Sequence, residues 1–287
     1  MSQKSKAAVI SIYSNTSLII IKVVAGILSG SVSIISEALH SASDLLASFI
    51  AYFSIKIAEK PADKDHPFGH GKFENVSGVI EALLIFVAAG WIIYESVHAI
   101  INPKELEQMG LAIVIMLISS VVNFFVSRYL YKVAKQTRSV ALEADALHLK
   151  TDVLTAAGIG IGLIIIWLTG YTFLDPIIAI LVALYILYES YLLLKKAFQP
   201  LTDIALPKEE IALIEEIINS HNLMFHGLRT RQAGQFRFVE FHLEMNKDAT
   251  LMEVHDICNL IENEIEVRLE NTEVTIHAEP REDESDK

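Results

Sequence analysis

Residues 145–152 read DALHLKTD, and the eighteen residues that follow, VLTAAGIGIGLIIIWLTG at 153–170, carry no charge. Residues 37–44 read EALHSASD, which repeats the pattern of acid-Ala-Leu-His with an Asp four positions after the His. Ionisable residues inside apolar spans are costly and usually mark a pathway or a site. Two matched copies in two apolar stretches therefore call for one joint explanation.

The spacing within each copy suits metal binding. In a helix, residues i and i+4 lie on one face with Cβ atoms about 6 Å apart, so His40 with Asp44 and His148 with Asp152 each present an imidazole and a carboxylate together. If the two helices pack together, the four groups form a set typical of tetrahedral Zn²⁺. Ca²⁺ and Mg²⁺ prefer more oxygen ligands. The alternative is that both histidines are ordinary polar residues of helix packing.

Glu37 and Asp145 lie one turn away on the same faces. They are not needed to complete a tetrahedron. They are either acids that line the approach to the site or plain charges at a helix mouth.

The composition predicts a membrane protein with a soluble tail. The 287 residues are 52% hydrophobic with a mean hydropathy of +0.42, which is high for a soluble domain. From residue 205 onward there are 19 acidic and 8 basic residues, whereas the preceding part is nearly neutral. We predict a transmembrane domain at 1–204, a cytoplasmic metal-binding and dimerisation domain at 205–280, and a disordered end at 281–287. The acidic tail argues against nucleic acid as a partner.

Six apolar stretches are long enough to cross a bilayer as helices. They lie near 7–28, 32–58, 78–101, 111–133, 144–169 and 174–197. Because Lys and Arg favour cytoplasmic loops, both termini are expected in the cytoplasm of a multi-pass inner-membrane protein. The basic residues on that side are Lys4, Lys6, Lys60, Lys64, Lys72, Lys132, Lys135, Arg138, Lys195 and Lys196, against Lys104 alone in the opposite loops.

The pattern of apolar residues in the tail is typical of a small α+β domain. KEEIALIEEIINS at 208–220 has isoleucines at helical spacing, GLRTRQAG and FRFVEFHLEM suggest two strands, a helix follows over 251–269, and VTIHAEP ends in a strand. The predicted order is α-β-β-α-β. The single cysteine, Cys258, excludes an intrachain disulfide and is expected to be a small buried residue of its helix.

Two further groups contain metal-type ligands. The segment PADKDHPFGHGK at 61–72 is either a second binding loop or a solvated turn held by Pro67 and Gly69. Scattered histidines of a soluble domain are usually unremarkable, so a metal role in the tail is one of two possibilities. The residues concerned are Asp63, Asp65, His66 and His70 in the loop, and His226, His242, His255, His277 and Glu279 in the tail.

Six motifs together resemble the cation diffusion facilitators, specifically the bacterial zinc transporter type with a cytoplasmic domain. The resemblance covers nearly the whole chain. The motifs are SGSVSIISEALHSASD at 29–44, HPFGHGK at 66–72, EADALHLKTDV at 143–153, LTDIALP at 201–207, LRTRQAG at 228–234 and FVEFHLEM at 238–245.

The resemblance implies a homodimeric antiporter, not an enzyme, that moves a divalent metal out of the cytoplasm in exchange for protons. It implies a metallochaperone-like tail and a charge pair of Lys72 with Asp203 between protomers. The best-studied members carry Asp where His40 stands, and HAE at 277–279 replaces HQD. The implied sites are His40, Asp44, His148 and Asp152 for transport, Asp63, His66 and His70 in the loop, and His226, His242, His255, His277 and Glu279 for two metals in the tail.

Protons and metal compete for neutral imidazole nitrogen, and an unperturbed imidazole titrates near pH 6.5, which suggests how proton exchange could be coupled. Zn²⁺ is the favoured ion, both as cargo and as a structural or regulatory ion, with Fe²⁺, Cd²⁺ and Mn²⁺ as alternatives. A membrane-anchored metal sensor is the alternative of another class, although a sensor needs no ligands inside its spans. An intramembrane metalloenzyme would need an open coordination position and a base, and HExxH does not occur.

Overall fold

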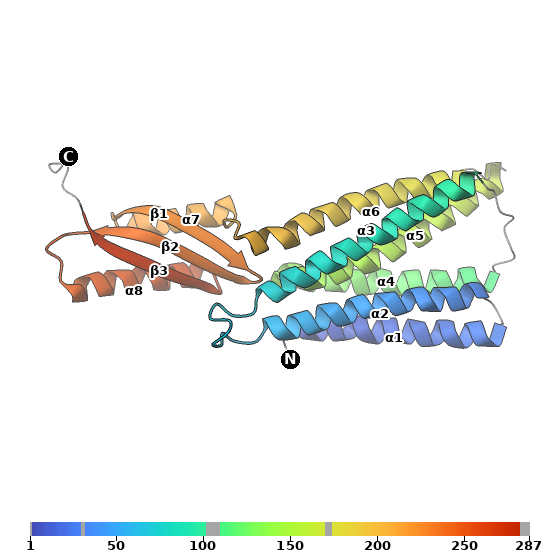
Figure 1. Ribbon diagram of the computed structural model, residues 1–287, viewed down its shortest axis with the longest axis horizontal. Helices are drawn as coiled ribbons and strands as arrows, with labels where there is room; N and C mark the ends of the chain where they lie inside the picture. Colours follow the sequence, from blue (N-terminus) through green and yellow to red (C-terminus); the bar gives the residue numbers. More distant parts are fainter. Residues whose placement is uncertain (1, 30–31, 102–109, 170–173, 282–287) are drawn as a thin grey trace. The chain divides into compact units, whose positions relative to one another are not determined.

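The computed structural model describes residues 2–29, 32–101, 110–169 and 174–281. The chain divides into two compact units, Met1–Phe198 and Gln199–Lys287. The first unit is a bundle of six long helices (Figure 1). Its helices are α1 (Gln3–Ser29), α2 (Val32–Ala58), α3 (Lys72–Ile101), α4 (Gly110–Thr137), α5 (Val140–Thr169) and α6 (Leu174–Phe198).

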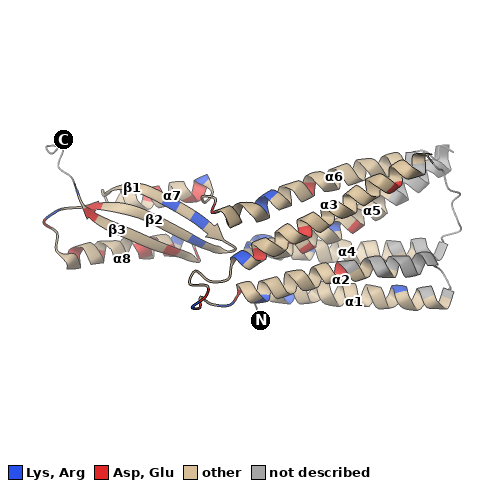
Figure 2. Cartoon of the chain, in the orientation of Figure 1, with Lys and Arg blue, Asp and Glu red and all other residues tan. Residues whose placement is uncertain are grey.

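Each of the six predicted spans corresponds to one of these helices. The largest difference is at α3, which begins at Lys72 rather than near residue 78, because its polar first turns continue the helix beyond the apolar stretch. Within the described residues, three segments are long and apolar enough to cross a membrane by length and composition alone: Gln3–Ala25, Lys72–His98 and Pro176–Thr202. Most of the Lys and Arg residues of the bundle lie near the end that carries the N-terminus (Figure 2).

The helices pack most extensively in the pairs α1 with α2, α3 with α6 and α4 with α5, and α2 also contacts α5. Alanines dominate the buried contacts, for example Ala51 of α2 with Ala141 and Ala146 of α5. Small side chains let helix backbones approach closely in membrane bundles. At Gly78, α3 approaches α5 so closely that an added Cβ would lie 2.7 Å from Val140 Cγ1.

The tail unit is a three-stranded sheet with two helices, as predicted. A short 3₁₀ turn (Gln199–Thr202) precedes it. Strand order is β1-β2-β3, with β1 and β2 antiparallel and β2 and β3 parallel. The elements are α7 (Lys208–Ser220), β1 (Met224–Ala233), β2 (Phe236–Met245), α8 (Leu251–Arg268) and β3 (Thr272–Pro280).

The tail core lies between the sheet and the helices. Ile214, Ile217 and Ile218 of α7 pack with Phe241 of β2 and Ile265 of α8, all at most 1% exposed. The helical spacing of the first three and the alternation along β2 therefore bring apolar faces together. The predicted disordered end, 281–287, lies outside the described residues apart from Arg281.

Thr250 and Glu253 form a capping box at the start of α8. The Thr250 hydroxyl accepts from the Glu253 backbone N–H at 3.3 Å, and the Glu253 carboxylate accepts from the Thr250 backbone N–H at 2.7 Å. We expect Thr250→Ala to lower the free energy of unfolding of the tail unit by about 1 kcal/mol, because the helix loses its side-chain acceptor. Thr250→Ser keeps that acceptor and should be close to wild type in urea unfolding of residues 199–287. Equal losses in both variants would contradict the role of the cap.

Candidate metal centres

The first centre lies inside the helical bundle, where α2 meets α5. His148 Nε2 is 3.0 Å from Asp44 Oδ1, and one ligand atom from each of Asp44, His148 and Asp152 lies within 4.8 Å of the others. Asp44 is only 4% exposed. A tetrahedral Zn²⁺ site holds such atoms roughly 3.4 Å apart, so a small contraction would bring the three around one ion.

Two asparagines and a serine support this centre. Asn123 of α4 donates to Asp152 Oδ2 at 3.3 Å, and Asn15 of α1 donates to the Asp44 carbonyl at 3.4 Å and to Ser48 Oγ at 2.9 Å. The Asn123 amide therefore fixes the direction of a ligand carboxylate, whereas Asn15 holds the backbone of Asp44 and the Ser48 side chain. Helices α1, α2, α4 and α5 thus all contribute to holding the centre in place.

The position of His40 in the sequence places it on α2, one turn before Asp44. The side chains of His40 and Glu37 lie outside the described residues. The role of His40 as the fourth ligand of this centre therefore stays a prediction from the i to i+4 spacing and the resemblance.

Asp145 is fully buried next to the centre rather than solvated at a helix mouth. Ser48 donates to Asp145 Oδ1 at 3.0 Å, while Asp145 Oδ2 has no hydrogen-bond partner among the described residues. Glu81 of α3 is also fully buried, and within the described ranges both of its carboxylate oxygens are unpartnered. Glu81 is not among the residues predicted from the sequence, although an acid in the middle of an apolar span is a visible signal.

The second centre is the loop between α2 and α3. Asp63 Oδ1 is 3.3 Å from His66 Nδ1 and Asp63 Oδ2 is 3.4 Å from His70 Nε2, with the imidazole centroids 4.3 Å apart. His70 is 6% exposed, and its Nδ1 has no partner within the described part of the chain. Three ligands with the fourth direction open to solvent suit a Zn²⁺ ion that keeps a water.

Backbone hydrogen bonds shape this loop. Asp63 Oδ1 accepts from the backbone N–H of His66 at 2.7 Å and of Asp65 at 3.0 Å, which is an Asx turn. The His66 N–H in particular holds the pKa of the Asp63 carboxyl below its ordinary value. Asp63 therefore remains an anionic ligand as the pH falls, and the turn that it stabilises is lost only when the pH passes below that lowered pKa. Gly69, at φ +77°, completes the turn in a conformation that favours glycine.

The third centre lies on the sheet of the tail. The strand register pairs His226 with His242 and His242 with His277, so the three imidazoles form a row across β1, β2 and β3. Glu279 reaches this row: its carboxylate oxygens are 2.9 Å from His226 Nε2 and 3.3 Å from His242 Nδ1. His226, His242 and Glu279 offer ligand atoms within 4.8 Å of one another.

Two predicted tail ligands, His277 and His255, lie outside the cluster of His226, His242 and Glu279. His277 Nε2 is 4.0 Å from Glu279, whereas His255 lies on α8 and its Nε2 is 3.0 Å from Asn259 Nδ2. Cys258 of α8 is half-buried against the tail core. Burial, aided by Glu262, raises the pKa of its thiol, so Cys258 is protonated at neutral pH and is a poor metal ligand.

Asp203, predicted to pair with Lys72 between protomers, lies 3.9 Å from Arg231 within the tail unit. A solvent-accessible pair at this distance contributes little to stability. The contact with a second protomer stays a prediction from the resemblance.

Family models cover both units. The cation efflux transmembrane domain matches residues 8–202, and the cytoplasmic domain of cation efflux proteins matches residues 206–281. The chain belongs to the cation efflux family. Members of this family are transporters, so this cation efflux protein is a membrane transporter of metal cations rather than an enzyme.

Relatives match over almost the full length of this cation efflux protein. An uncharacterized transporter of Synechocystis, sll1263, is 36% identical over 96% of this chain and 90% of its own. The cation-efflux pump FieF of Citrobacter koseri is 32% identical over 96% of this chain and 92% of its own. A solved structure of CzrB in a Zn form is 35% identical and covers 30% of this chain and 97% of that one, at a TM-score of 0.26.

The row of imidazoles on the tail sheet, together with Glu279, predicts that the tail binds Zn²⁺. Residues 199–287 should bind Zn²⁺ in calorimetry at neutral pH, with affinity falling as the pH drops through about 6.5, where free imidazole protonates. Glu279→Gln should weaken binding because it removes the carboxylate that bridges His226 and His242. Glu240→Gln removes an exposed acid of the same sheet that lies outside the cluster and serves as the control. Equal affinity of all three proteins would contradict the ligand role of Glu279.

Proposed function

We propose that this cation efflux protein exports Zn²⁺ from the cytoplasm in exchange for protons, as a homodimer in the inner membrane. The observation that carries the proposal is the cluster of Asp44, His148 and Asp152 between two helices of the bundle, with Asp44 buried and the other two partly buried. Charged ligands placed inside the spans serve passage of an ion, since a structural or sensory site needs no such depth.

The donor set supports Zn²⁺ over the alternatives. One imidazole nitrogen and two carboxylate oxygens, with His40 proposed as the fourth ligand, form a mixed shell of the kind that Zn²⁺ accepts in tetrahedral geometry. A second nitrogen disfavours Mn²⁺, which prefers oxygen ligands. Fe²⁺ and Cd²⁺ remain the competing substrates.

Proton exchange is proposed to act through the same groups that hold the metal. A neutral imidazole binds metal and a protonated one does not, so binding and release of protons at the site oppose binding and release of metal. His148 already lies at hydrogen-bond distance from Asp44. The carboxylate that would share the metal is thus positioned to stabilise an imidazolium when the metal has left.

Both termini are proposed to be cytoplasmic. The basic residues of the bundle gather near the end that carries the N-terminus, and short basic loops stay on the cytoplasmic side. The loop with Asp63, His66 and His70 belongs to that end and would meet cytoplasmic metal.

Removing one carboxylate of the bundle centre tests the transport site. We expect Asp152→Ala and Asp44→Ala to reduce Zn²⁺ uptake into proteoliposomes with an imposed pH gradient to background, because the remaining ligands cannot complete the shell. Glu95→Ala, which removes an exposed carboxylate from α3, should transport normally. Uptake by Asp152→Ala at the rate of wild type would disprove the site. The same assay distinguishes a transporter from a membrane-anchored sensor, which would give no flux.

Changing the proposed nitrogen ligand tests selectivity. His40→Asp should raise transport of Cd²⁺, and of Mn²⁺ or Fe²⁺, relative to Zn²⁺, because the shell becomes richer in hard oxygen. Competition between isotopically labelled Zn²⁺ and each rival ion gives the ratio directly. A ratio that does not change would remove His40 from the selectivity of the site.

A further inference from the structure

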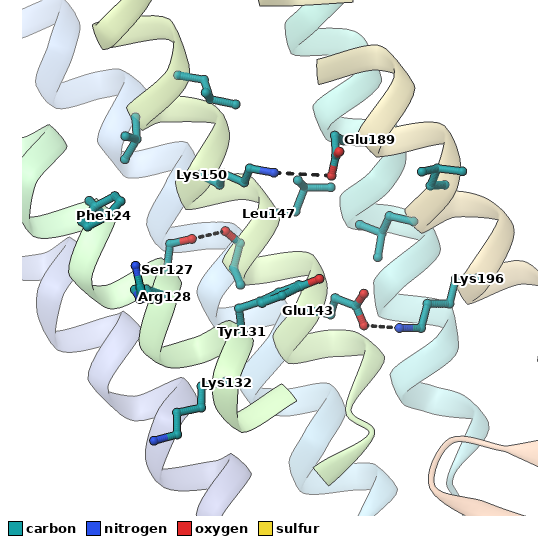
Figure 3. A pocket seen from close by; sticks show the side chains of 15 residues that line it. Phe124, Ser127, Arg128, Tyr131, Lys132, Glu143, Leu147, Lys150, Glu189 and Lys196 are labelled. Carbon is teal, nitrogen blue, oxygen red and sulfur yellow. Dashed lines mark hydrogen bonds and ion pairs between the residues drawn. The ribbon is translucent and has the colours of Figure 1, made fainter. Parts of the chain in front are cut away.

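A groove of about 830 Å³ runs along the outside of the bundle, with α5 as its floor and α4 and α6 as its walls (Figure 3). None of its lining residues belongs to a metal centre: on α5 the groove is lined by Ala146, Leu147 and Lys150 among others, whereas the metal ligands of that helix are His148 and Asp152. The metal centres therefore do not account for the groove.

The groove changes from charged to apolar along its length. Lys132, Glu143 and Lys196 lie near the end of the bundle where α4 and α6 stop and α5 begins, and Arg128, Lys150 and Glu189 lie one to two turns further in (Figure 3). Beyond them the lining is Phe124, Val153 and Leu154. Phe124 precedes the end of α4 by thirteen residues, which at 1.5 Å per residue is about 20 Å along the helix.

The charged part has a surplus of cations. Lys196 Nζ is 2.5 Å from Glu143 Oε2, and Lys150 Nζ is 3.5 Å from Glu189 Oε2, so both lining carboxylates are already paired. Arg128 and Lys132 are exposed and form no ion pair with any residue of the described ranges. They are four residues apart on α4, so their side chains leave the same face of the helix.

The surroundings of the groove are apolar and face outward. Val121 and Phe125 of α4 are 57% and 65% exposed, and Leu184 of α6 is 52% exposed. In a protein of this membrane-spanning family, such a surface contacts lipid chains rather than water. The surplus of positive charge repels divalent cations and so argues against a metal pathway.

We propose that this groove binds an anionic phospholipid, with its phosphate between Arg128 and Lys132 and one acyl chain along Val153, Leu154 and Phe124. The order of charged and apolar lining matches the order of head group and chain in a lipid of one leaflet. Basic pockets between membrane helices recognise anionic head groups in this way. The proposal goes beyond metal transport and does not depend on which ion is carried.

Photo-crosslinking of the full-length protein tests it. The protein is reconstituted in nanodiscs that contain phosphatidylcholine with a small fraction of phosphatidylglycerol bearing a diazirine in one chain. Labelled peptides are then mapped by mass spectrometry. We expect labels on peptides that contain Val153, Leu154 or Phe124, and a loss of roughly tenfold in Arg128→Gln/Lys132→Gln, since each cation near an anionic lipid contributes severalfold to binding.

Three controls decide the result. Lys6→Gln/Lys195→Gln removes two exposed cations that do not line the groove and should label like wild type. Diazirine-labelled phosphatidylcholine should label the groove weakly, and excess inorganic phosphate should not compete with the labelled phosphatidylglycerol, because the chain contributes binding. Equal labelling by both lipids, loss in the control pair as large as in the groove pair, or labels confined to other helices would each overturn the proposal. Zn²⁺ uptake measured on the same samples shows that the variants are folded.

Discussion

The cost of burying charge inside the helical bundle is the constraint on which the rest of the structure depends. A carboxylate or imidazolium without partners in an apolar interior costs several kcal/mol, so each must be paired, hydrogen-bonded or bound to metal. Asp44 and His148 satisfy this by facing each other across the contact of α2 with α5. Asp152 satisfies it through Asn123. The helix contact and the centre thus require each other.

The same requirement explains polar contacts elsewhere in the bundle. Lys4 of α1 donates to Glu74 of α3 at 2.5 Å, and Ser139 donates to the other oxygen of that carboxylate, also at 2.5 Å. In the groove on the outer side, Lys196 forms an ion pair with Glu143 and Lys150 forms one with Glu189. Asp145, with one buried oxygen, and Glu81, with two, are exceptions whose oxygens lack a partner in the described chain, and such groups in a membrane interior usually mark functional positions.

Three local geometries assemble similar ligand sets in one chain. In the bundle, the i to i+4 spacing of a helix directs an imidazole and a carboxylate the same way. In the loop, an Asx turn at Asp63 folds the chain back so that one carboxylate reaches two histidines. On the tail sheet, neighbouring strands in register place His226, His242 and His277 side by side. Each geometry leaves different access to solvent: Asp44 of the bundle centre is 4% exposed, whereas the His66 and Asp63 side chains of the loop are 46% and 53% exposed.

The sequence by itself determined the elements, because apolar periodicity and length are local properties. From it follow the six helices of the bundle, the order α-β-β-α-β of the tail and the resemblance to cation efflux proteins. Its main error is the start of α3, where polar turns extend the helix beyond the apolar stretch. It also indicated which histidines and acids are candidate metal ligands. Only the tertiary structure decided which of them meet: that Asp44 lies against His148, that Glu279 reaches His226 rather than His277, that Asp145 and Glu81 are buried and that Asn123 contacts Asp152 of the centre. These outcomes depend on which helix faces touch and on strand register, and contacts between residues about a hundred positions apart leave no trace in local spacing.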